Sequence, residues 1–408
     1  MSDVDQTTRT RPPWWERSDL THRDGKLLFG GVEVQHLAEE NGTPTYVYNR
    51  NRIADNLSRL IKALNDAHPR SHIFYAMKSN RYEPILRWMA SRGDVGIDAC
   101  SPGEVKLALR CGFKEGQISY TATGMSSREW ENVLQHPDII VNADALGDIR
   151  KIGQIAPGRS IGIRVNPGVS IGYRQNPKLM YTQQSRFSKF GISMDDCDEG
   201  FQLAKQLNLQ IRGIHAHAGC GYLEEQLPQY KQLLERLARL TQAFPQLEYL
   251  NLGGGLGIPL VEGDGSWNLQ RWSSLLRSHF GDWQGQLYCE PGDYLVKDSG
   301  LLLGEITNIE TKCGKRVVWV NAGFNVHHEP VFYSLPLFPV PVVEGPGDSE
   351  TVTIVGNINE GHDIWMEDIL MPPLKEGDIL AFLNAGGYGA SMSSNHCCRG
   401  NFSEVMIP

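Results

Sequence analysis

The sequence predicts an α/β protein in which a closed (β/α)₈ barrel is followed by an all-β domain. Between residues 47 and 295, short apolar runs rich in β-branched or aromatic residues alternate with amphipathic stretches of helical length. After about residue 296 the helical stretches stop, and strand-like segments are separated by Gly/Pro turns. The chain has 408 residues, of which 40% are hydrophobic, so it is long enough for a barrel and a second domain.

Eight apolar runs are the candidate barrel strands. They are Ile73–Ala76, Val95–Asp98, Ile118–Tyr120, Ile139–Val141, Ile161–Val165, Ile211–His215, Tyr249–Leu252 and Leu287–Glu290. The candidate helices are Asn51–Ala67, Tyr82–Arg92, Gly103–Cys111, Ser127–Leu134, Ala145–Ala156, Met194–Leu207, Glu224–Ala243 and Leu269–Phe280. Repeated strand–helix alternation indicates a closed parallel barrel rather than an open sheet. The longer gap from Asn166 to Lys189 predicts an extended loop at the barrel mouth.

The change of pattern also sets the predicted domains. Residues 47–295 form the barrel, residues 296–408 form the β domain, and residues 27–46 are expected to add a strand to the β domain. The expected strands of the β domain are Leu301–Ile309, Arg316–Asn321, Thr351–Val355, Asp378–Leu383 and Glu404–Ile407. Residues 1–26 are interpreted as an N-terminal arm in which Trp14 and Trp15 dock onto the rest of the protein.

Composition argues against several classes of function. The chain carries 39 Lys+Arg against 47 Asp+Glu, a net charge of −8, and no basic run, so nucleic acid is not an expected partner. The eight cysteines form no CxxC pair and are expected to be reduced thiols. The sequence has neither a signal-peptide pattern nor a long apolar run, so we expect a cytoplasmic protein with no membrane segment.

Chemically reactive residues collect at the C-terminal ends of the predicted strands, where barrel enzymes place their active sites. Lys78 follows the first strand, Asp98 ends the second, Arg164 ends the fifth and Glu290 ends the eighth. A lysine in a barrel mouth can lose its proton by desolvation and act as an amine nucleophile. A lone lysine is more often a surface residue, so its neighbours decide between the two interpretations.

The neighbours favour a pyridoxal phosphate site. Gly253, Gly254 and Gly255 follow the seventh strand and would expose backbone N–H groups to a phosphate, although a tight turn explains three glycines about as well. A carboxylate at Glu290 could keep a pyridine nitrogen protonated, and an imidazole of the HAHAG segment could stack on the ring. A nucleophilic lysine, phosphate-binding glycines and such a carboxylate are the parts that this cofactor needs.

A metal site is the weaker alternative. His215 and His217 share one strand face, and His327 and His328 are adjacent in the chain. Carboxylate partners at ligand spacing are lacking, so we expect no metal.

Seven motifs carry a resemblance to a known family. They are FYAMKSN, RVNPG with a later SKFGI, GIHAHAG, NLGGGLG, EPGDYLV, VNAGFN and AGGYGASMSSNH. In this order, from about Thr45 to the C-terminus, they resemble the fold-type III pyridoxal-phosphate decarboxylases, most closely the diaminopimelate decarboxylase group, whose relatives act on ornithine and arginine. The resemblance implies an alanine-racemase-like barrel with a C-terminal β domain, and a homodimer with active sites at the subunit interface.

Roles follow from the resemblance position by position. It implies that Lys78 binds pyridoxal 5′-phosphate covalently, that His217 lies over the cofactor ring and that Glu290 contacts the pyridine nitrogen. It also implies that Gly253–Gly255 bind the phosphate, with Tyr388 reaching both phosphate and substrate. Asp98 and Arg164, at neighbouring strand ends, complete the expected cofactor site.

The chain departs from the family pattern where substrate is bound. Asp293 replaces the arginine of the usual EPGR, and Glu329 replaces the arginine that precedes Pro-x-x-Tyr, whereas Tyr333 keeps the expected type. Two carboxylates in place of two guanidiniums would repel an anionic distal group instead of clamping it. The resemblance therefore implies a substrate pocket unlike that for meso-diaminopimelate.

Two further departures affect the partner subunit's contribution and the phosphate site. Asn359-Glu360 stands where the family has a cysteine–glutamate pair from the second subunit, so we expect Asn359 at the catalytic position and Glu360 beside the substrate. Cys220 replaces a phosphate-contacting serine. A neutral Asn cannot donate a proton as a thiol does, and water, His217 or a tyrosine could substitute.

The leading hypothesis is a pyridoxal-phosphate-dependent amino-acid decarboxylase. Its small-molecule substrate would be a basic amino acid such as ornithine or lysine, or a diamino-acid conjugate from a siderophore-type pathway. The alternative is a racemase or a non-catalytic relative on the same scaffold. Racemases of the related barrel usually place arginine at the pyridine nitrogen, so Glu290 argues against a racemase.

Overall fold

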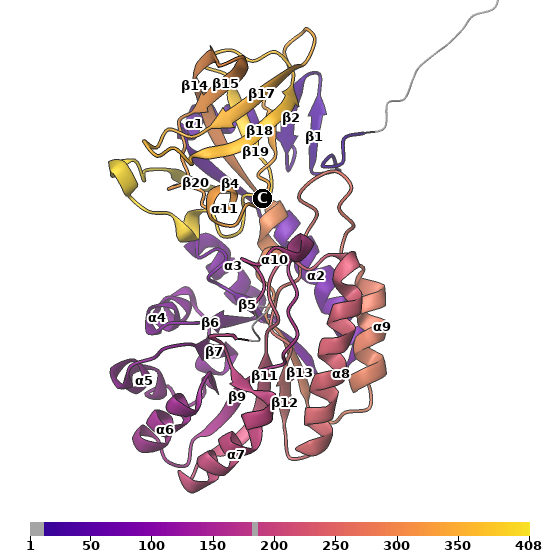
Figure 1. The fold of residues 1–408 in the computed structure, drawn as a ribbon, viewed down its shortest axis with the longest axis vertical. Helices are drawn as coiled ribbons and strands as arrows, with labels where there is room; N and C mark the ends of the chain where they lie inside the picture. Colours follow the sequence, from indigo (N-terminus) through magenta and orange to yellow (C-terminus); the bar gives the residue numbers. More distant parts are fainter. Residues whose placement is uncertain (1–11, 182–186) are drawn as a thin grey trace, which may run out of the picture.

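The computed structural model describes residues 12–181 and 187–408, which form two lobes stacked along the long axis of the molecule (Figure 1). Within these residues, the lower lobe is a closed parallel barrel wrapped by helices, and the upper lobe is mostly sheet. The fold predicted from the sequence, a (β/α)₈ barrel with a separate β domain, is confirmed.

The barrel strands are all parallel to their neighbours. They are β5 (Ser71–Ala76), β6 (Gly96–Ala99), β7 (Ile118–Ala122), β8 (Ile140–Ala143), β9 (Ser160–Asn166), β11 (Gln210–Ala216), β12 (Tyr249–Asn251) and β13 (Gln286–Cys289). Pairing of β8 with β9 and of β13 with β5 closes the barrel, so all the C-terminal strand ends surround one mouth. The short β10 (Ile192–Ser193) extends the β9 edge at that mouth.

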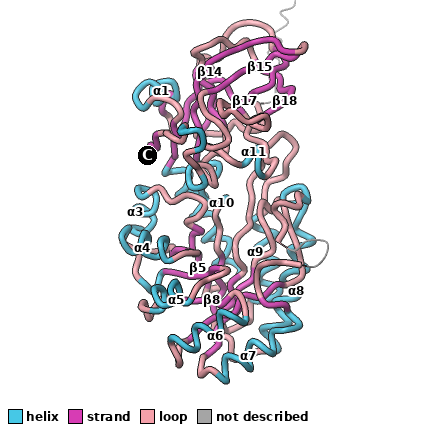
Figure 2. Tube along the Cα trace, turned by 60° about the vertical axis from the view of Figure 1, so that its left-hand side comes forward, coloured by secondary structure: helices cyan, strands magenta, loops and turns pink. Residues whose placement is uncertain are grey.

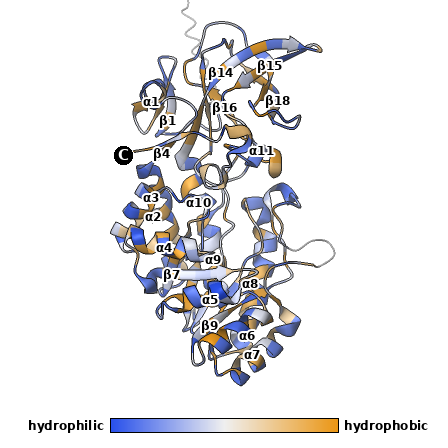
Figure 3. Ribbon diagram, turned by 90° about the vertical axis from the view of Figure 1, so that its left-hand side faces the viewer, coloured by the Kyte–Doolittle hydropathy of each residue, from blue (hydrophilic) through white to orange (hydrophobic). Residues whose placement is uncertain are grey.

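Helices cover the outside of the barrel, as Figure 2 shows. They are α2 (Arg50–Ala67), α3 (Glu83–Arg92), α4 (Pro102–Cys111), α5 (Ser127–Leu134), α6 (Leu146–Ile155), α7 (Cys197–Gln206), α8 (Leu227–Ala243) and α9 (Leu269–Phe280). Apolar residues three or four apart, such as Ile53, Leu57, Leu60 and Leu64 of α2, are buried, so one face packs inward. Both polar and apolar stretches are visible on these helices in Figure 3. No helix of the described residues is long and apolar enough to cross a membrane.

The β domain is built around one large sheet. Its strands are β4 (Thr45–Asn49), β14 (Gly300–Lys312), β15 (Lys315–Val320), β16 (Pro339–Pro341), β17 (Glu350–Val355), β18 (Ile364–Met371), β19 (Ile379–Phe382) and β20 (Ser403–Ile407). The N-terminal segment enters this sheet through β4, which pairs antiparallel with β14 and parallel with β20. Before it come β1 (Leu20–Arg23), β2 (Lys26–Phe29) and β3 (Val32–Glu33), which form a small separate sheet, and α1 (Val34–Asn41).

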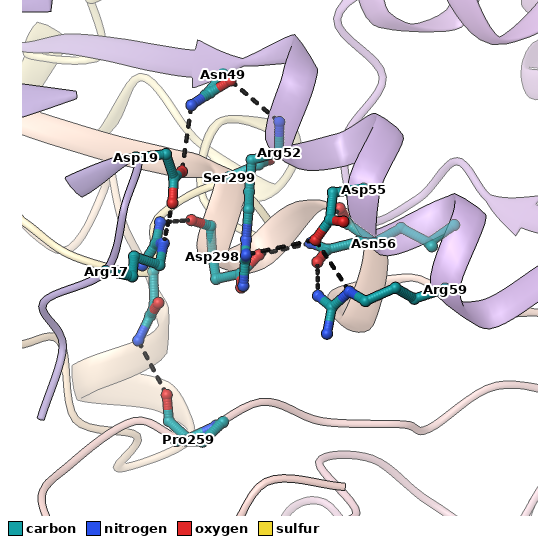
Figure 4. A network of polar contacts seen from close by, with 12 residues as sticks. Arg17, Asp19, Asn49, Arg52, Asp55, Asn56, Arg59, Pro259, Asp298 and Ser299 are labelled. Atoms are coloured by element: carbon teal, nitrogen blue, oxygen red, sulfur yellow. Dashed lines mark hydrogen bonds and ion pairs between the residues drawn. The ribbon is translucent and has the colours of Figure 1, made fainter. Parts of the chain in front are cut away.

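A polar network centred on Asp298 joins the lobes (Figure 4). The Asp298 carboxylate accepts hydrogen bonds from Arg52 at 3.0 Å and Asn56 at 2.7 Å, both on α2. Its backbone carbonyl accepts from Arg17 of the N-terminal arm at 2.6 Å. Charge-assisted bonds of this kind are the stronger class, so the segment that links the barrel to β14 is held from two sides. The arm is also anchored by Trp14, which packs edge-on against Phe338.

Candidate active site

Lys78 lies two residues beyond the end of β5 and contacts Asp98 on the neighbouring strand β6. Its Nζ donates a hydrogen bond to Asp98 Oδ2 at 2.5 Å. Burial by itself lowers the pKa of Lys78, but the charges around it, with Asp98 first and Glu290 among them, together outweigh burial, and the net pKa is raised. Burial, together with the charge of Glu290, raises the pKa of Asp98 to about 7. The amine is therefore cationic at neutral pH, with a carboxylate beside it that can take its proton.

Glu290, directly after β13, is held as a carboxylate at the floor of the barrel mouth. It accepts hydrogen bonds from Ser119 Oγ at 3.0 Å, His215 Nε2 at 2.7 Å and Asn251 Nδ2 at 2.6 Å. Burial alone would raise its pKa, but His215 and the other donors lower the pKa to about 2. Since its acceptor is a carboxylate, His215 Nε2 carries the proton of this bond. The site thus keeps a fixed negative charge at the position where the sequence predicts one.

His217 and Arg164 lie beside the loop between β9 and β10. The His217 ring packs 4.8 Å from the Tyr181 ring. The Arg164 guanidinium lies 4.5 Å over Phe190 and donates to Asp144 at 3.0 Å. Burial and the nearby cations Arg164 and Lys78 keep the pKa of His217 well below its ordinary value, so its imidazole is neutral.

The Gly253–Gly255 segment packs too tightly for any side chain. A Cβ on Gly254 would lie 2.1 Å from the Glu290 carbonyl oxygen, and one on Gly255 would lie 2.4 Å from that of Gly219. Gly255 also has φ +94°, which favours glycine. Among the described residues, nothing accepts a hydrogen bond from the N–H of Gly254 or Gly255. Two N–H donors without a partner beside the buried site favour a phosphate-binding segment over an ordinary turn.

A cavity of about 460 Å³ opens beside Lys78 between the barrel mouth and the β domain. Of the residues predicted from the sequence, Lys78, Asp293, Glu329, Tyr333 and Tyr388 line it. His217 and Arg164 reach it through their contacts with Tyr181 and Phe190, which also belong to the lining. Tyr388 has φ +53°, and its backbone N–H donates to the Ser79 carbonyl beside Lys78.

The two acidic residues that replace the expected arginines share one buried lysine. Lys297 follows the short helix α10 (Asp293–Val296), and its ammonium contacts the carboxylate of Glu329, at the start of α11 (Glu329–Phe332). Lys297 Nζ lies 3.7 Å from Asp293 Oδ1. His327 Nε2 lies 3.5 Å from the other Glu329 oxygen. The cavity wall therefore holds two carboxylates and one ammonium.

The pKa values of this cluster follow from its burial and charge. Burial and the charge of Glu329 raise the pKa of Asp293 to about 6, against the opposing effect of Lys297. Burial acts in the same direction on Glu329, but Lys297 and His327 lower its net pKa. Lys297 itself has a raised pKa because the two carboxylates outweigh its burial. At neutral pH the cluster keeps a negative excess.

Asn359 and Glu360 lie outside the cavity of their own chain. Both side chains are exposed on the loop between β17 and β18, and Glu360 Oε1 lies 3.2 Å from His396 Nε2. The structure therefore does not bring them together with Lys78 within one chain.

Several site residues are missed by sequence reasoning. Ser119 and Asn251 hold Glu290, Tyr181 packs on His217, and Lys297 pairs with the two acids. Strand position could have found Ser119 and Asn251, which lie on β7 and β12 near the barrel mouth, but no motif marks Lys297.

The histidines considered for a metal have other contacts: His215 contacts Glu290, and His327 contacts Tyr46 and Glu329. Across residues 12–181 and 187–408 we find no cluster of three His, Cys, Asp or Glu side chains that could hold a metal ion.

The residues present fit pyridoxal 5′-phosphate. Glu290 supplies a buried carboxylate with a depressed pKa for the pyridine nitrogen, and Lys78 supplies the amine. The glycine segment supplies free N–H donors at a place where a Cβ would collide with the barrel backbone. The amine, the carboxylate and the N–H donors each follow a different strand at the barrel mouth.

Comparisons with known proteins agree. Residues 54–297 match the family model described as the pyridoxal binding domain of pyridoxal-dependent decarboxylases. The diaminopimelate decarboxylase of Methanothermobacter thermautotrophicus is 33% identical and covers 94% of this chain and 91% of its own; that of Aquifex aeolicus is 30% identical and covers 95% and 92%. The crystal structure of diaminopimelate decarboxylase from Helicobacter pylori complexed with L-lysine superimposes with a TM-score of 0.83 at 26% identity, covering 92% and 94%. The chain belongs to the pyridoxal-dependent decarboxylases, carboxy-lyases that use pyridoxal 5′-phosphate.

Proposed function

We propose that this enzyme decarboxylates an amino acid whose distal group is cationic or donates a hydrogen bond, and that meso-diaminopimelate is not its substrate. The observation that carries the proposal is the Asp293–Lys297–Glu329 cluster in the wall of the cavity that holds Lys78. The relatives are named diaminopimelate decarboxylases, but a distal carboxylate entering this cavity would meet two carboxylates. Their single shared ammonium is already paired, so such a substrate would be repelled.

The roles of the residues follow from their positions. When bound, pyridoxal phosphate withdraws electrons from the substrate's Cα as the carboxylate leaves as CO₂. Lys78 holds the cofactor covalently, and Glu290 keeps the pyridine nitrogen protonated. With the cofactor bound, the neutral His217 ring would lie against its ring, and Gly253–Gly255 with Tyr388 would bind its phosphate. Asp98 takes the proton of Lys78, Arg164 supports the loop beside the ring, and Tyr333 with Tyr388 forms the wall around the substrate.

A second subunit completes the site in this proposal. Asn359 and Glu360 face solvent away from the cavity of their own chain, which is where residues offered to a partner would lie. Reprotonation of the product Cα then falls to water or to a cavity tyrosine, because Asn359 has no proton to give.

Two types of substrate have a distal group that is compatible with the Asp293–Lys297–Glu329 cluster. One is a basic amino acid such as ornithine or lysine, whose ammonium would face the carboxylates. The other is a diamino-acid conjugate of the kind made in siderophore pathways, whose distal nitrogen carries an acyl group.

A CO₂-release screen tests the proposal. The panel contains meso-diaminopimelate, ornithine, lysine and citrate-conjugated diamino acids, and optical rotation is followed in parallel. We expect CO₂ from one of the latter substrates. Loss of optical activity without CO₂ would instead identify a racemase.

A further inference from the structure

The Asp293–Lys297 pair offers the substrate both an acceptor and a donor. The Asp293 carboxylate keeps 14% of its surface where it lines the cavity, and its buried Oδ1 lies 3.7 Å from Lys297 Nζ, beyond hydrogen-bond distance. An ammonium has three N–H donors, and Glu329 takes one from Lys297. The pair therefore has unused hydrogen-bonding capacity at the cavity wall, which a substrate group with both a donor and an acceptor would use.

We propose that this pair recognises a secondary amide in the distal part of the substrate, with Asp293 accepting the amide N–H and Lys297 donating to its carbonyl oxygen. The inference deepens the proposed function and rests on it. A free ammonium could satisfy Asp293 but would place a second cation beside Lys297. A carboxylate could satisfy Lys297 but would face Asp293 and Glu329. A neutral amide satisfies both groups without adding charge.

The pair is held firmly enough for such recognition. Lys297 is 3% exposed, and the next residue, Asp298, is fixed by Arg17, Arg52 and Asn56 (Figure 4). The main-chain position of Lys297 is therefore set from both lobes. Glu329 also lies 3.5 Å from His327 Nε2, and the other ring nitrogen of His327, Nδ1, lies 3.1 Å from the Tyr46 hydroxyl.

The cavity also has room beyond the pair for an acyl group. Its lining continues to the apolar Ile258, Leu260 and Leu335. The exposed Lys178 also lines the cavity; its Nζ donates to Ser334 Oγ at 3.3 Å and makes no ion pair with any described carboxylate. An acyl group could pack on these apolar residues, and a carboxylate on it could pair with Lys178.

The first test compares ligands on the unmodified, cofactor-loaded enzyme. Ornithine and Nδ-acetylornithine differ in whether the distal nitrogen is a free ammonium or an amide. We expect kcat/KM for CO₂ release to be at least about tenfold higher for the acetylated substrate, the usual size of a charge-assisted hydrogen bond. Binding of the two product amines, putrescine and N-acetylputrescine, measured by calorimetry, should show the same order.

The ligand comparison separates the two ideas. Faster CO₂ release from ornithine, or tighter binding of putrescine, would overturn the amide inference while leaving decarboxylation intact. No CO₂ from any amino acid of the panel, with cofactor bound, would contradict the proposed function itself.

Substitution provides the second test. Lys297→Met removes the donor at similar size, and Lys297→Gln keeps a neutral donor; Lys205→Met on the exposed face of α7 is the matched control. We expect the acetylornithine-to-ornithine ratio to fall about tenfold in the Met variant, to recover partly in the Gln variant and to stay unchanged in the control. A purely structural role would lower both substrates equally and leave the ratio constant, which would contradict the inference. If the Met variant does not fold, the ligand comparison still decides.

Discussion

The ammonium of Lys297 and the carboxylate of Glu329 are in direct contact in the wall of the cavity that contains Lys78. Glu329 stands where the resemblance to the family predicts an arginine, and here Lys297 supplies the cation, which Glu329 already pairs. The two carboxylates therefore give this part of the cavity wall a net negative charge.

Borohydride reduction should fix the cofactor on Lys78. Lys78 is the lysine beside Asp98 at the barrel mouth, so we expect a yellow protein that, after reduction and digestion, carries the added mass on the peptide containing Lys78. Lys78→Ala should carry none, whereas Lys106→Ala, an exposed position on α4, should remain labelled. Label on another lysine of the unmodified protein would remove the basis of the site.

Asp98→Asn should lower the pKa of Lys78. Asp98 is the largest of the charges that raise that pKa against the effect of burial, and the neutral amine is the form that attacks the cofactor. The rate at which apoenzyme recombines with pyridoxal phosphate should therefore rise at lower pH in the variant than in the unmodified protein. Stopped-flow absorbance over a pH series measures this, and an unshifted profile would show that Asp98 does not control the amine.

Glu290→Gln should reduce kcat by about a hundredfold or more, because a neutral amide cannot keep a pyridine nitrogen protonated. Glu248→Gln, at the opposite end of the barrel, is the control. The native pKa of Glu290, about 2, lies below its ordinary value of 4.5. Its ionisation therefore contributes on the order of 3 kcal/mol above pH 4.5, a contribution that is lost as the pH falls from 4.5 through about 2.

Denaturant unfolding measures the stability effect of Glu290. The difference in unfolding free energy between the unmodified protein and Glu290→Gln should shrink between pH 4.5 and pH 2.5. A difference that does not change with pH would contradict the depressed pKa.

Mixed dimers should recover activity if the site is shared. Lys78→Ala and Glu360→Ala subunits are each inactive in this account, but one hybrid site retains both residues. Up to about a quarter of full activity is expected in a statistical mixture, where half the dimers are hybrids with one intact site of two. Activity assays after subunit exchange measure it, with exchange verified by mass-tagged subunits. Exchanged hybrids that stay inactive would indicate a site built within one chain.

Regular periodicity explains why the barrel is predictable from sequence. Each expected barrel strand and helix overlaps an observed one, because the buried faces repeat in step with the secondary structure. The strands β16 and β18 are not expected. β16 is three residues long with two prolines, and β18 is interrupted by Asp368 at φ +52°. These two segments form strands because they pair with neighbouring strands, and their own sequence pattern does not predict it.

The charge pairs around the substrate cavity are less predictable. Arg174 pairs with Asp264 at 2.7 Å, and Glu329 contacts Lys297 and His327. Lys297 is 32 residues from Glu329, and their contact arises from how the segment after the barrel folds against α11. No local pattern encodes such a long-range pair.

The most direct test of the central claim is the ratio of kcat/KM for meso-diaminopimelate to that for the preferred substrate of the CO₂-release screen, measured in the unmodified enzyme and in Glu329→Gln. The account predicts that meso-diaminopimelate is at least tenfold poorer, and that Glu329→Gln costs the preferred substrate about ten- to a hundredfold. Efficient turnover of meso-diaminopimelate by the unmodified enzyme, or indifference of the preferred substrate to both Glu329→Gln and Asp293→Asn, would contradict it.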